Sequence, residues 1–450
     1  MRIGIIQSRA EAGDFSGNLR RIVQGYRSCL DLGAEFVVAS AQALDGSFVG
    51  GLRERSSFLL QAQAALKALA EEVRLPLLLG SYASAPHQAA PTPAPFLIHG
   101  GEVHRLANRS VVQIGEHRVF ADVGGESTLP PPAGVGCDAV LHLPQTAWHV
   151  DCTREWKTIT THEANETQCP ALIVQGLGCS AGKLHAGGSL YALPGGEPRM
   201  LPLFEAAECV LPTQGAPHAE PPCTALSAII FCLRETLEQG NYQGLAVAAE
   251  EPRGPLLLAL AREAVGAERT VGLAWEPSPA CASLGQQILL PPPPQTQKPG
   301  LLRRFKAQIL ADCAEEHKLL LLSTESLRET LLGTPLLPAD ACGSLAPLGD
   351  MEDSRILRVQ QELNARSGGK LELPPLPCMP PEEERELLML AVEGRSPFEM
   401  LLGHNSTDET RLRRLLRQLN HAANQAPPPP RALQLRRHRC TLPPHHKLIE

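Results

Sequence analysis

The chain has 450 residues, enough for two or three domains and a sizeable hydrophobic core. A net charge of −7, with 20% charged and 43% hydrophobic residues, favours neither an intrinsically disordered protein nor a generally basic nucleic-acid-binding surface. The 13 cysteines include no CxxC pair, so their spacing indicates neither a disulfide framework nor a zinc site. We therefore expect a soluble globular protein with no metal and no cofactor.

The sequence carries no segment that predicts export or membrane insertion. Residues 1–7 form an apolar run that is too short for the core of a signal peptide. The longest apolar stretch, residues 225–233, is about half as long as a membrane-spanning helix requires. We therefore expect a cytoplasmic protein with reduced cysteines and no membrane partner.

In the first two hundred residues, short β-branched runs alternate with helical periods, which is typical of an α/β layered domain. Apolar residues share one face of a helix over residues 18–32, and Gly33 is expected to end it. Two more helices are predicted over residues 56–73 and 153–165. Strands are predicted over residues 3–6, 36–38, 77–79, 96–98, 103–106, 119–120, 139–143 and 171–174.

The polar segment 213–222 contains glycine and proline and lies between two apolar-periodic regions. We predict a linker there, with one domain over residues 1–212 and another over residues 223–450. In the second domain, helices are predicted over residues 223–238, 256–265 and 301–317, and strands over residues 244–248, 270–274 and 319–322. This alternation favours a doubly wound parallel sheet.

Several short motifs, in order along the chain, resemble those of the bacterial glutamine-dependent NAD synthetases, in which a nitrilase-like amidase is fused to an ATP-pyrophosphatase domain. The sequence GDFSGN at 13–18 is similar to that family's GDFxGN, GAEFVV at 33–38 to its GADLVV strand, and APLGD at 346–350 to its APLKD. CPALIV at 169–174, followed by GGS at 187–189, resembles a late amidase strand and its turn. The resemblance implies a nitrilase-like αββα sandwich followed by a Rossmann-like, doubly wound domain.

In that family the amidase uses a carboxylate as general base, a cysteine nucleophile and a lysine that stabilises the oxyanion. The resemblance matches these three positions to Ala41, Phe120 and Asn108, none of which has the required group. Losing one member of such a unit costs about 10⁴ to 10⁶ in turnover, so no glutamine hydrolysis is expected. Cys137 and Cys179 have no evident base beside them, and we expect buried, inert thiols rather than replacement nucleophiles.

The synthetase half of that family holds the ATP pyrophosphate on an SGGxDS loop through backbone N–H groups and a helix dipole. The matching residues here are Ala249, Glu250, Glu251, Pro252, Arg253 and Gly254. Two glutamates replace glycines and would repel phosphate, and the proline removes a donor. Arg253 could touch a phosphate, but we favour pairing with a neighbouring glutamate in a solvated loop. The family's ATGNKSE segment is matched by LSTESLR at 322–328, which lacks the asparagine and the lysine.

Two basic segments near the end of the chain are candidate interaction sites. Leucines at 412, 415, 416 and 419 lie among arginines and form one face of a basic helix. This helix could dock a partner, but we expect it to pack on its own domain. Residues 436–439 and 445–447 are basic, and we interpret them as a solvated terminus rather than a nucleic-acid or metal site.

These observations predict a pseudoenzyme that resembles glutamine-dependent NAD synthetase but has lost both active sites. Because that family assembles into large homo-oligomers, the resemblance implies a self-assembling scaffold, a structural polymer, or a regulatory subunit that associates with an active NAD synthetase. Two alternatives stay open: a sensor that binds a nucleotide or dinucleotide without turnover, and a residual NAD synthetase that amidates deamido-NAD with ATP. No nucleic-acid partner is expected.

Overall fold

A computed structural model describes residues 1–46, 49–84, 91–124, 131, 136–180, 182–211, 224–296, 298–332, 343–393, 395, 400, 408–425 and 431–435. The chain divides into two compact units, Met1–Ala228 and Ile229–Glu450. The predicted linker at 213–222 and the basic residues at 436–439 and 445–447 lie outside the described residues. Within the described part, no helix is long and apolar enough to cross a membrane.

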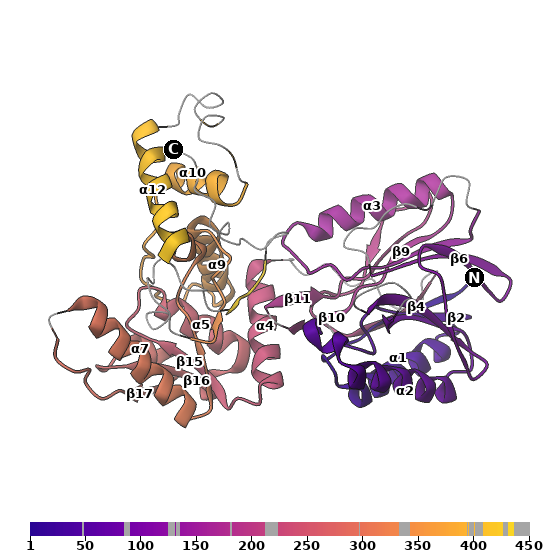
Figure 1. Ribbon diagram of the computed structural model, residues 1–450, viewed down its shortest axis with the longest axis horizontal. Coiled ribbons are helices and arrows are strands. Elements are labelled where there is room, and N and C mark those ends of the chain that lie inside the picture. Colours follow the sequence, from indigo (N-terminus) through magenta and orange to yellow (C-terminus); the bar gives the residue numbers. More distant parts are fainter. Residues whose placement is uncertain are drawn as a thin grey trace. The chain divides into compact units, whose positions relative to one another are not determined.

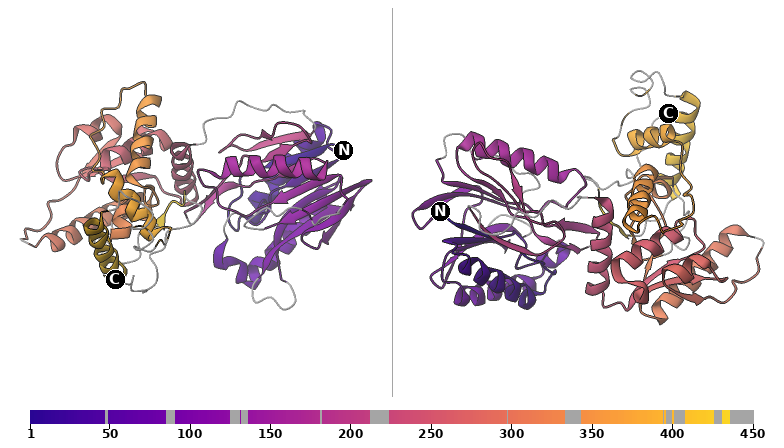
Figure 2. Two further views of the ribbon diagram at one scale, coloured as in Figure 1. Left: turned by 90° about the horizontal axis from the view of Figure 1, so that it is seen from above. Right: turned by 180° about the vertical axis from the view of Figure 1, so that it is seen from behind.

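The first unit has four layers, in which two sheets face each other and helices cover both outer faces (Figures 1 and 2). Helices α1 and α2 pack on the sheet of order β14-β1-β2-β3-β4-β5, and α3 packs on the sheet of order β13-β12-β9-β8-β7-β6. Strands β10 and β11 form a separate hairpin. The predicted nitrilase-like αββα sandwich is therefore confirmed.

The helices of this unit are α1 (Phe15–Asp31), α2 (Ser56–Glu72) and α3 (Cys152–Thr167), with a 3-10 turn at Gly50–Glu54. Its strands are β1 (Ile3–Gln7), β2 (Phe36–Ala39), β3 (Leu77–Ala83), β4 (Thr92–His99), β5 (Glu102–Arg105), β6 (Ser110–Ile114), β7 (His117–Val123), β8 (Ala139–Leu143), β9 (Ala171–Ile173), β10 (Leu177–Ser180), β11 (Lys183–Ala186), β12 (Leu190–Ala192), β13 (Arg199–Met200) and β14 (Ala207–Leu211).

Local sequence signals explain the first of these helices. Asp14 caps α1, because its carboxylate accepts a hydrogen bond from the Gly17 N–H at 2.9 Å. Ile22 and Tyr26 lie on the buried face that packs on the first sheet. Gly33 follows the helix with φ +81°, a backbone conformation that favours glycine.

A buried polar network fixes α3 to the second sheet. His142 of β8 is 1% exposed, and its Nε2 lies 2.9 Å from both carboxylate oxygens of Glu163 on α3. Its Nδ1 lies 3.6 Å from Asp122 of β7, which in turn accepts from Arg109 at 2.8 Å. Burial lowers the pKa of His142, but the two flanking carboxylates outweigh burial, so the pKa of His142 is raised.

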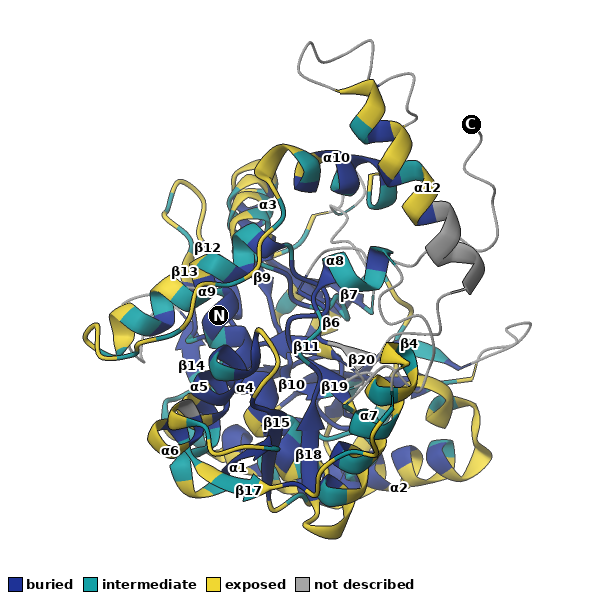
Figure 3. Ribbon diagram, turned by 90° about the vertical axis from the view of Figure 1, so that its left-hand side faces the viewer, coloured by how far each residue is buried: buried dark blue, intermediate teal, exposed yellow. Residues whose placement is uncertain are grey.

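The second unit is built on a parallel sheet of order β17-β16-β15-β18-β19-β20. Ala246 of β15 packs in one cluster with Leu310 of α7, whereas a Cβ at Gly272 of β16 would approach Leu258 of α5. Helices α5 and α7 therefore cover opposite faces, and the predicted doubly wound sheet is confirmed. Figure 3 shows its central strands β15 and β18 as buried.

The helices are α4 (Ala225–Gln239, which begins in the first unit), α5 (Gly254–Val265), α6 (Pro279–Leu284), α7 (Pro299–Glu316), α8 (Leu327–Leu332), α9 (Asp353–Arg366), α10 (Pro381–Ala391) and α12 (Glu409–Gln425), with a 3-10 turn at Ala267–Arg269. The strands are β15 (Gly244–Ala248), β16 (Thr270–Ala274), β17 (Gln286–Leu289), β18 (Leu319–Leu322), β19 (Leu345–Ala346) and β20 (Arg431–Ala432).

The basic helix predicted near the end of the chain is α12. Leu412, Leu415 and Leu419 are each at most 2% exposed and pack in one cluster with α8 and α10. Arg411 binds Glu386 of α10 through two hydrogen bonds of 2.7 Å. The prediction that this helix packs on its own domain is confirmed.

Candidate functional site

Two of the three amidase positions predicted from the sequence meet at the end of β7. Ala41 follows β2 and is fully buried between the two sheets. A Cβ on Gly80 of β3 would lie 2.7 Å from the Ala41 Cα and 2.8 Å from a methyl carbon of Val123. Ala41 and Val123 therefore flank Gly80, with no room for a larger residue at position 80.

Asn108 lies between β5 and β6 and binds the backbone of the same valine. Its Nδ2 donates to the Val123 carbonyl oxygen at 2.8 Å, and its Oδ1 accepts from the Val123 N–H at 2.7 Å. Both ends of the amide are thus used to hold the last residue of β7. A lysine at position 108 could not accept from this N–H.

Phe120 does not join this group. Successive side chains of a strand point to opposite faces, and Val119, Ala121 and Val123 face the core between the two sheets. Phe120 packs in the separate cluster that includes Ala164 of α3. The structure brings Ala41 and Asn108 to Val123, whereas Phe120, an odd number of residues earlier, faces away.

An acid that the sequence analysis overlooked lies close to this group. Asp45 is fully buried and accepts hydrogen bonds from Ser81 Oγ at 2.8 Å and from the Tyr82 N–H at 2.7 Å. Burial raises the pKa of Asp45 to about 7. No signal in the sequence separates Asp45 from an ordinary turn aspartate, because its burial depends on β3, which lies more than thirty residues later.

Buried polar side chains gather near the strand ends of the first unit. Within the described residues, the buried side chains with a polar atom that lacks a hydrogen-bond partner include Ser8, Ser40, Gln42, Trp148 and Gln175. The two cysteines considered earlier do not alter this arrangement. Cys179 is 4% exposed on β10, and burial raises the pKa of Cys137 to about 12, so its thiol stays protonated near neutral pH.

In the second unit, the loop between β15 and α5 corresponds to the predicted phosphate loop. Gly254 begins α5, and a Cβ there would lie 2.5 Å from the Ala248 carbonyl oxygen, so only glycine fits this close approach. Glu250 accepts from the backbone N–H groups of Trp275 at 2.8 Å and Glu276 at 3.1 Å. Glu250 therefore holds the end of β16 in place.

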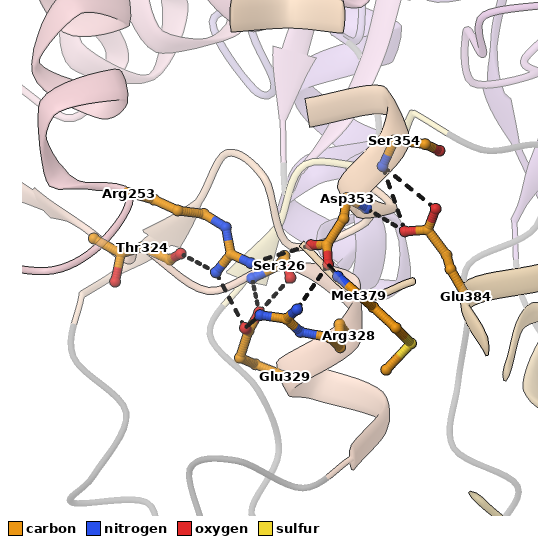
Figure 4. Close-up of polar contacts among 9 residues, drawn as sticks. All are labelled: Arg253, Thr324, Ser326, Arg328, Glu329, Asp353, Ser354, Met379 and Glu384. Atoms are coloured by element: carbon orange, nitrogen blue, oxygen red, sulfur yellow. Dashed lines mark hydrogen bonds and ion pairs between the residues drawn. The ribbon is translucent and has the colours of Figure 1, made fainter. Parts of the chain in front are cut away.

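Arg253 takes part in a four-residue ring of charges, which we call the arginine–carboxylate ring (Figure 4). Its two terminal nitrogens lie 3.1 Å from Glu329 of α8 and 3.1 Å from Asp353 of α9. Arg328 contacts the same two carboxylates, each at 2.8 Å. The ring has two positive and two negative charges, so each guanidinium is already paired with carboxylates.

The ring is mostly buried, and further hydrogen bonds fix it. Arg253 is 5% exposed, so the prediction that it pairs with a neighbouring glutamate in a solvated loop is wrong. Asp353 also accepts from the Met379 N–H at 2.8 Å, and Ser326 donates to Glu329. Burial raises the pKa of Glu329, but the charge of Arg253 and hydrogen bonds from Ser326 and Arg328 outweigh burial and hold it at about 2.

The two arginines of the ring lie at positions that the sequence resemblance matches to acids of the NAD synthetase motifs. Arg253 matches the aspartate of SGGxDS, and Arg328 matches the final glutamate of ATGNKSE. Sequence reasoning found both positions but missed their partners, because Glu329 and Asp353 lie outside the two motifs. The signal available in the sequence was that both motif positions, 253 and 328, carry arginine where the motifs have an acid, which indicates a network of ion pairs.

A cavity of about 280 Å³ adjoins the ring. Its lining combines basic and acidic side chains with apolar ones: Glu251, Arg303, Lys306, Leu310, Leu322 and Glu325, together with Arg253, Arg328 and Glu329 of the ring. Burial, together with the nearby charge of Glu329, raises the pKa of Glu325 to about 7. Within the described residues, no group of three or more His, Cys, Asp or Glu side chains could hold a metal ion.

The fold places this chain in a definite class: a nitrilase-like sandwich and a doubly wound parallel α/β unit on one polypeptide. No sequence model of a protein family matches it, and no curated protein matches it significantly in sequence.

Solved structures identify the particular architecture. The glutamine-dependent NAD⁺ synthetase from Acinetobacter baumannii, solved with ADP, matches with a TM-score of 0.69 and 15% identity, over 96% of this chain and 95% of that one. The glutamine-dependent NAD⁺ synthetase from Cytophaga hutchinsonii matches with a TM-score of 0.73 and 11% identity, over 94% of this chain and 92% of that one. At these identities the likeness shows a shared fold: the chain has the fused two-domain architecture of these synthetases.

Proposed function

We propose that this chain is a pseudoenzyme with the glutamine-dependent NAD synthetase fold, and that it acts as a self-assembling scaffold or a regulatory subunit. The observation that carries the proposal is the arginine–carboxylate ring at the phosphate loop. Arg253 and Arg328 are already bound to Glu329 and Asp353, so neither guanidinium is free to take a phosphate.

Electrostatics at the loop also disfavour ATP. Glu251 lines the adjoining cavity in place of a glycine of the motif. A carboxylate and a phosphate charge about 4 Å apart repel by about 4 kcal/mol at an effective dielectric constant of about 20. Pro252 supplies no backbone N–H to the loop. We propose that residues 249–254 hold the second unit together instead of holding a nucleotide.

For the first unit, we propose that Ala41, Asn108 and Val123 occupy the positions of the base, the lysine and the nucleophile. The supporting geometry is the convergence of Ala41 and Asn108 on Val123. An alanine methyl, a backbone-bound amide and a valine cannot transfer a proton, stabilise an oxyanion or attack a carbonyl.

The partners we propose follow from the architecture alone. If the chain keeps the whole fold but has lost the reacting groups, its remaining means of function is to bind other molecules through its surface. We propose homo-oligomers, including open polymers, and association with an active NAD synthetase, in a reducing cytoplasm and without nucleic acid or membrane. We also propose that residues 213–222 link the two domains.

The first experiment is an activity measurement. Purified protein is incubated with deamido-NAD, ATP and either glutamine or ammonia, and NAD is quantified beside a Glu250→Gln/Glu251→Gln variant purified identically. We expect the same background in both samples. NAD formation by the wild type at a rate that survives in the double variant would overturn the pseudoenzyme proposal.

A nucleotide sensor is the second candidate, and the cavity beside the ring is the observation that favours it. Thermal shift against ATP, NAD, deamido-NAD and glutamine separates the two, because a ligand that binds the folded state raises the melting temperature. Saturable stabilisation supports the sensor, and its absence supports the scaffold. Light scattering tests assembly: a monomer at micromolar concentration would count against a self-assembling scaffold.

A further inference from the structure

Two cysteines of the first unit lie in contact on neighbouring strands. Cys137 lies just before β8 and Cys169 just before β9, and their Sγ atoms are 3.9 Å apart although the residues are 32 positions apart in sequence. Cys169 is 6% exposed and Cys137 is half-buried, so Cys137 is the more accessible residue of the two. Both cysteines are free thiols in this structure.

The backbone around the pair is held by the parallel sheet. Val140 and Ala171 are directly paired, and the Val140 N–H donates to the Pro170 carbonyl oxygen at 2.9 Å. Neighbouring strands are separated by about 4.8 Å, which is within the range of Cα separations that disulfides span. The two cysteines are offset by one residue in this register, and their sulfurs, 3.9 Å apart, must approach by about 2 Å to form a disulfide bond.

We propose that Cys137 and Cys169 form a redox-responsive dithiol that a small-molecule disulfide, such as oxidised glutathione, converts into an intramolecular disulfide. The Cys137 thiolate attacks one sulfur of oxidised glutathione and releases one glutathione thiolate. Cys169 then loses its proton and attacks the Cys137 sulfur of the mixed disulfide, which releases the second glutathione. Two protein thiols are oxidised and one small disulfide is reduced, so no other oxidant is needed.

The surroundings of the pair set how fast this exchange runs. Burial and the nearby Cys169 raise the pKa of Cys137 to about 12, so its thiolate is scarce near neutral pH. The first step is therefore slow at pH 7, and its rate rises about tenfold for each pH unit between 7 and 9. This pH dependence distinguishes the buried pair from an exposed, reactive thiol.

Oxidation stabilises the first unit because it closes a loop that contains β8 and α3. A cross-link that closes a loop of about 30 residues lowers the entropy of the unfolded chain and so stabilises the folded state. In a unit of about 230 residues, this corresponds to a rise of roughly 5–10 °C in the melting temperature. The bond also ties β8 to β9, and both strands contribute to the cluster that contains Ala164 of α3, so slower amide exchange in α3 is a second expected effect.

The test uses the full-length chain equilibrated in mixtures of reduced and oxidised glutathione. Thiols are blocked with N-ethylmaleimide after denaturation, and non-reducing digestion followed by mass spectrometry locates the cross-link. The wild type and Cys313→Ser, which removes a half-buried thiol of α7, are expected to give a 137–169 cross-linked peptide and the higher melting temperature. Cys137→Ser and Cys137→Ala are expected to show neither effect.

Three results would overturn the proposal: glutathione adducts without a 137–169 cross-link, a cross-link between other cysteines, or an oxidised chain whose melting temperature equals that of the reduced one. The two substitutions at position 137 guard against a misfolded variant. The far-ultraviolet circular dichroism of each variant is compared with that of the reduced wild type before oxidation. Activity enters none of these measurements, so the outcome is independent of the proposed function.

Discussion

Replacing Arg253 with methionine removes two ion pairs of the arginine–carboxylate ring while keeping an unbranched side chain. The side chains of Glu329 and Asp353 are 19% and 2% exposed, so Arg253→Met leaves one excess negative charge in a largely buried site. Removing one partner of a buried ion pair costs about 3–5 kcal/mol. Because Arg328 still contacts both carboxylates, we expect the lower end of this range, about 3 kcal/mol.

Amide hydrogen exchange is a suitable assay, since it reports opening free energies peptide by peptide and separates the two units. Peptides from α5, α8 and α9 are expected to exchange faster in Arg253→Met, and peptides from α1 and α2 are not. Arg413→Met is the matched control, because its pair with Glu409 is exposed on α12 and is worth less than about 1 kcal/mol.

A double-mutant cycle isolates the ion pair itself. In the Glu329→Gln background the excess charge is absent, so Arg253→Met is expected to cost less than in the wild type, with a coupling of about 1–3 kcal/mol. If Arg253→Met destabilises the second unit no more than Arg413→Met does, the ring is not a structural element. The principal support for the pseudoenzyme proposal would then be lost.

Three further predictions concern other residues. Burial raises the pKa of Glu325 to about 7, so its contribution to stability is full below pH 4.5 and is lost as the pH rises to 7. Glu325→Gln is therefore expected to stabilise the second unit by up to about 3 kcal/mol at pH 8 and to change little at pH 4, in urea denaturation at both pH values. Burial lowers the pKa of His142, but the two flanking carboxylates outweigh burial and raise it. The wild type is therefore expected to lose stability as the pH rises above 6.5. His142→Gln should lack this loss in thermal melts across pH 6–9, and an unchanged slope would refute the assignment. Asp14→Ala removes the cap of α1 and is expected to cost about 1 kcal/mol, measured as faster exchange in the first turns of that helix. Asp14→Asn, which keeps an acceptor, is its control.

The layered fold could be predicted from the sequence because its signals are local. Helical and strand periods indicate the elements, and short motifs in a fixed order indicate the arrangement. The helix predicted over residues 18–32 corresponds to α1 at Phe15–Asp31, and the strand predicted over residues 119–120 is the middle of β7 at His117–Val123. Element bounds shifted by a few residues because strand ends depend on pairing with neighbours.

Which residues of β7 face the core between the sheets was not predictable in the same way. A shift by an odd number of residues along a strand moves a side chain to the opposite face, and no local pattern distinguishes Phe120 from Val123 when both are apolar. The distinction appears only when Gly80 of β3 and Asn108 are brought against the strand. The candidate positions therefore depend on contacts between segments that are distant in sequence.

Composition, periodicity and motif order were enough to establish two α/β units and to locate the loop at residues 249–254, because each of these properties belongs to a short stretch of chain. The partners of Arg253 followed from packing alone, since Glu329 and Asp353 reach it only when α5, α8 and α9 meet at the end of the sheet. A charge in a sequence has many candidate partners, and burial selects among them because an unpaired charge is costly once water is excluded.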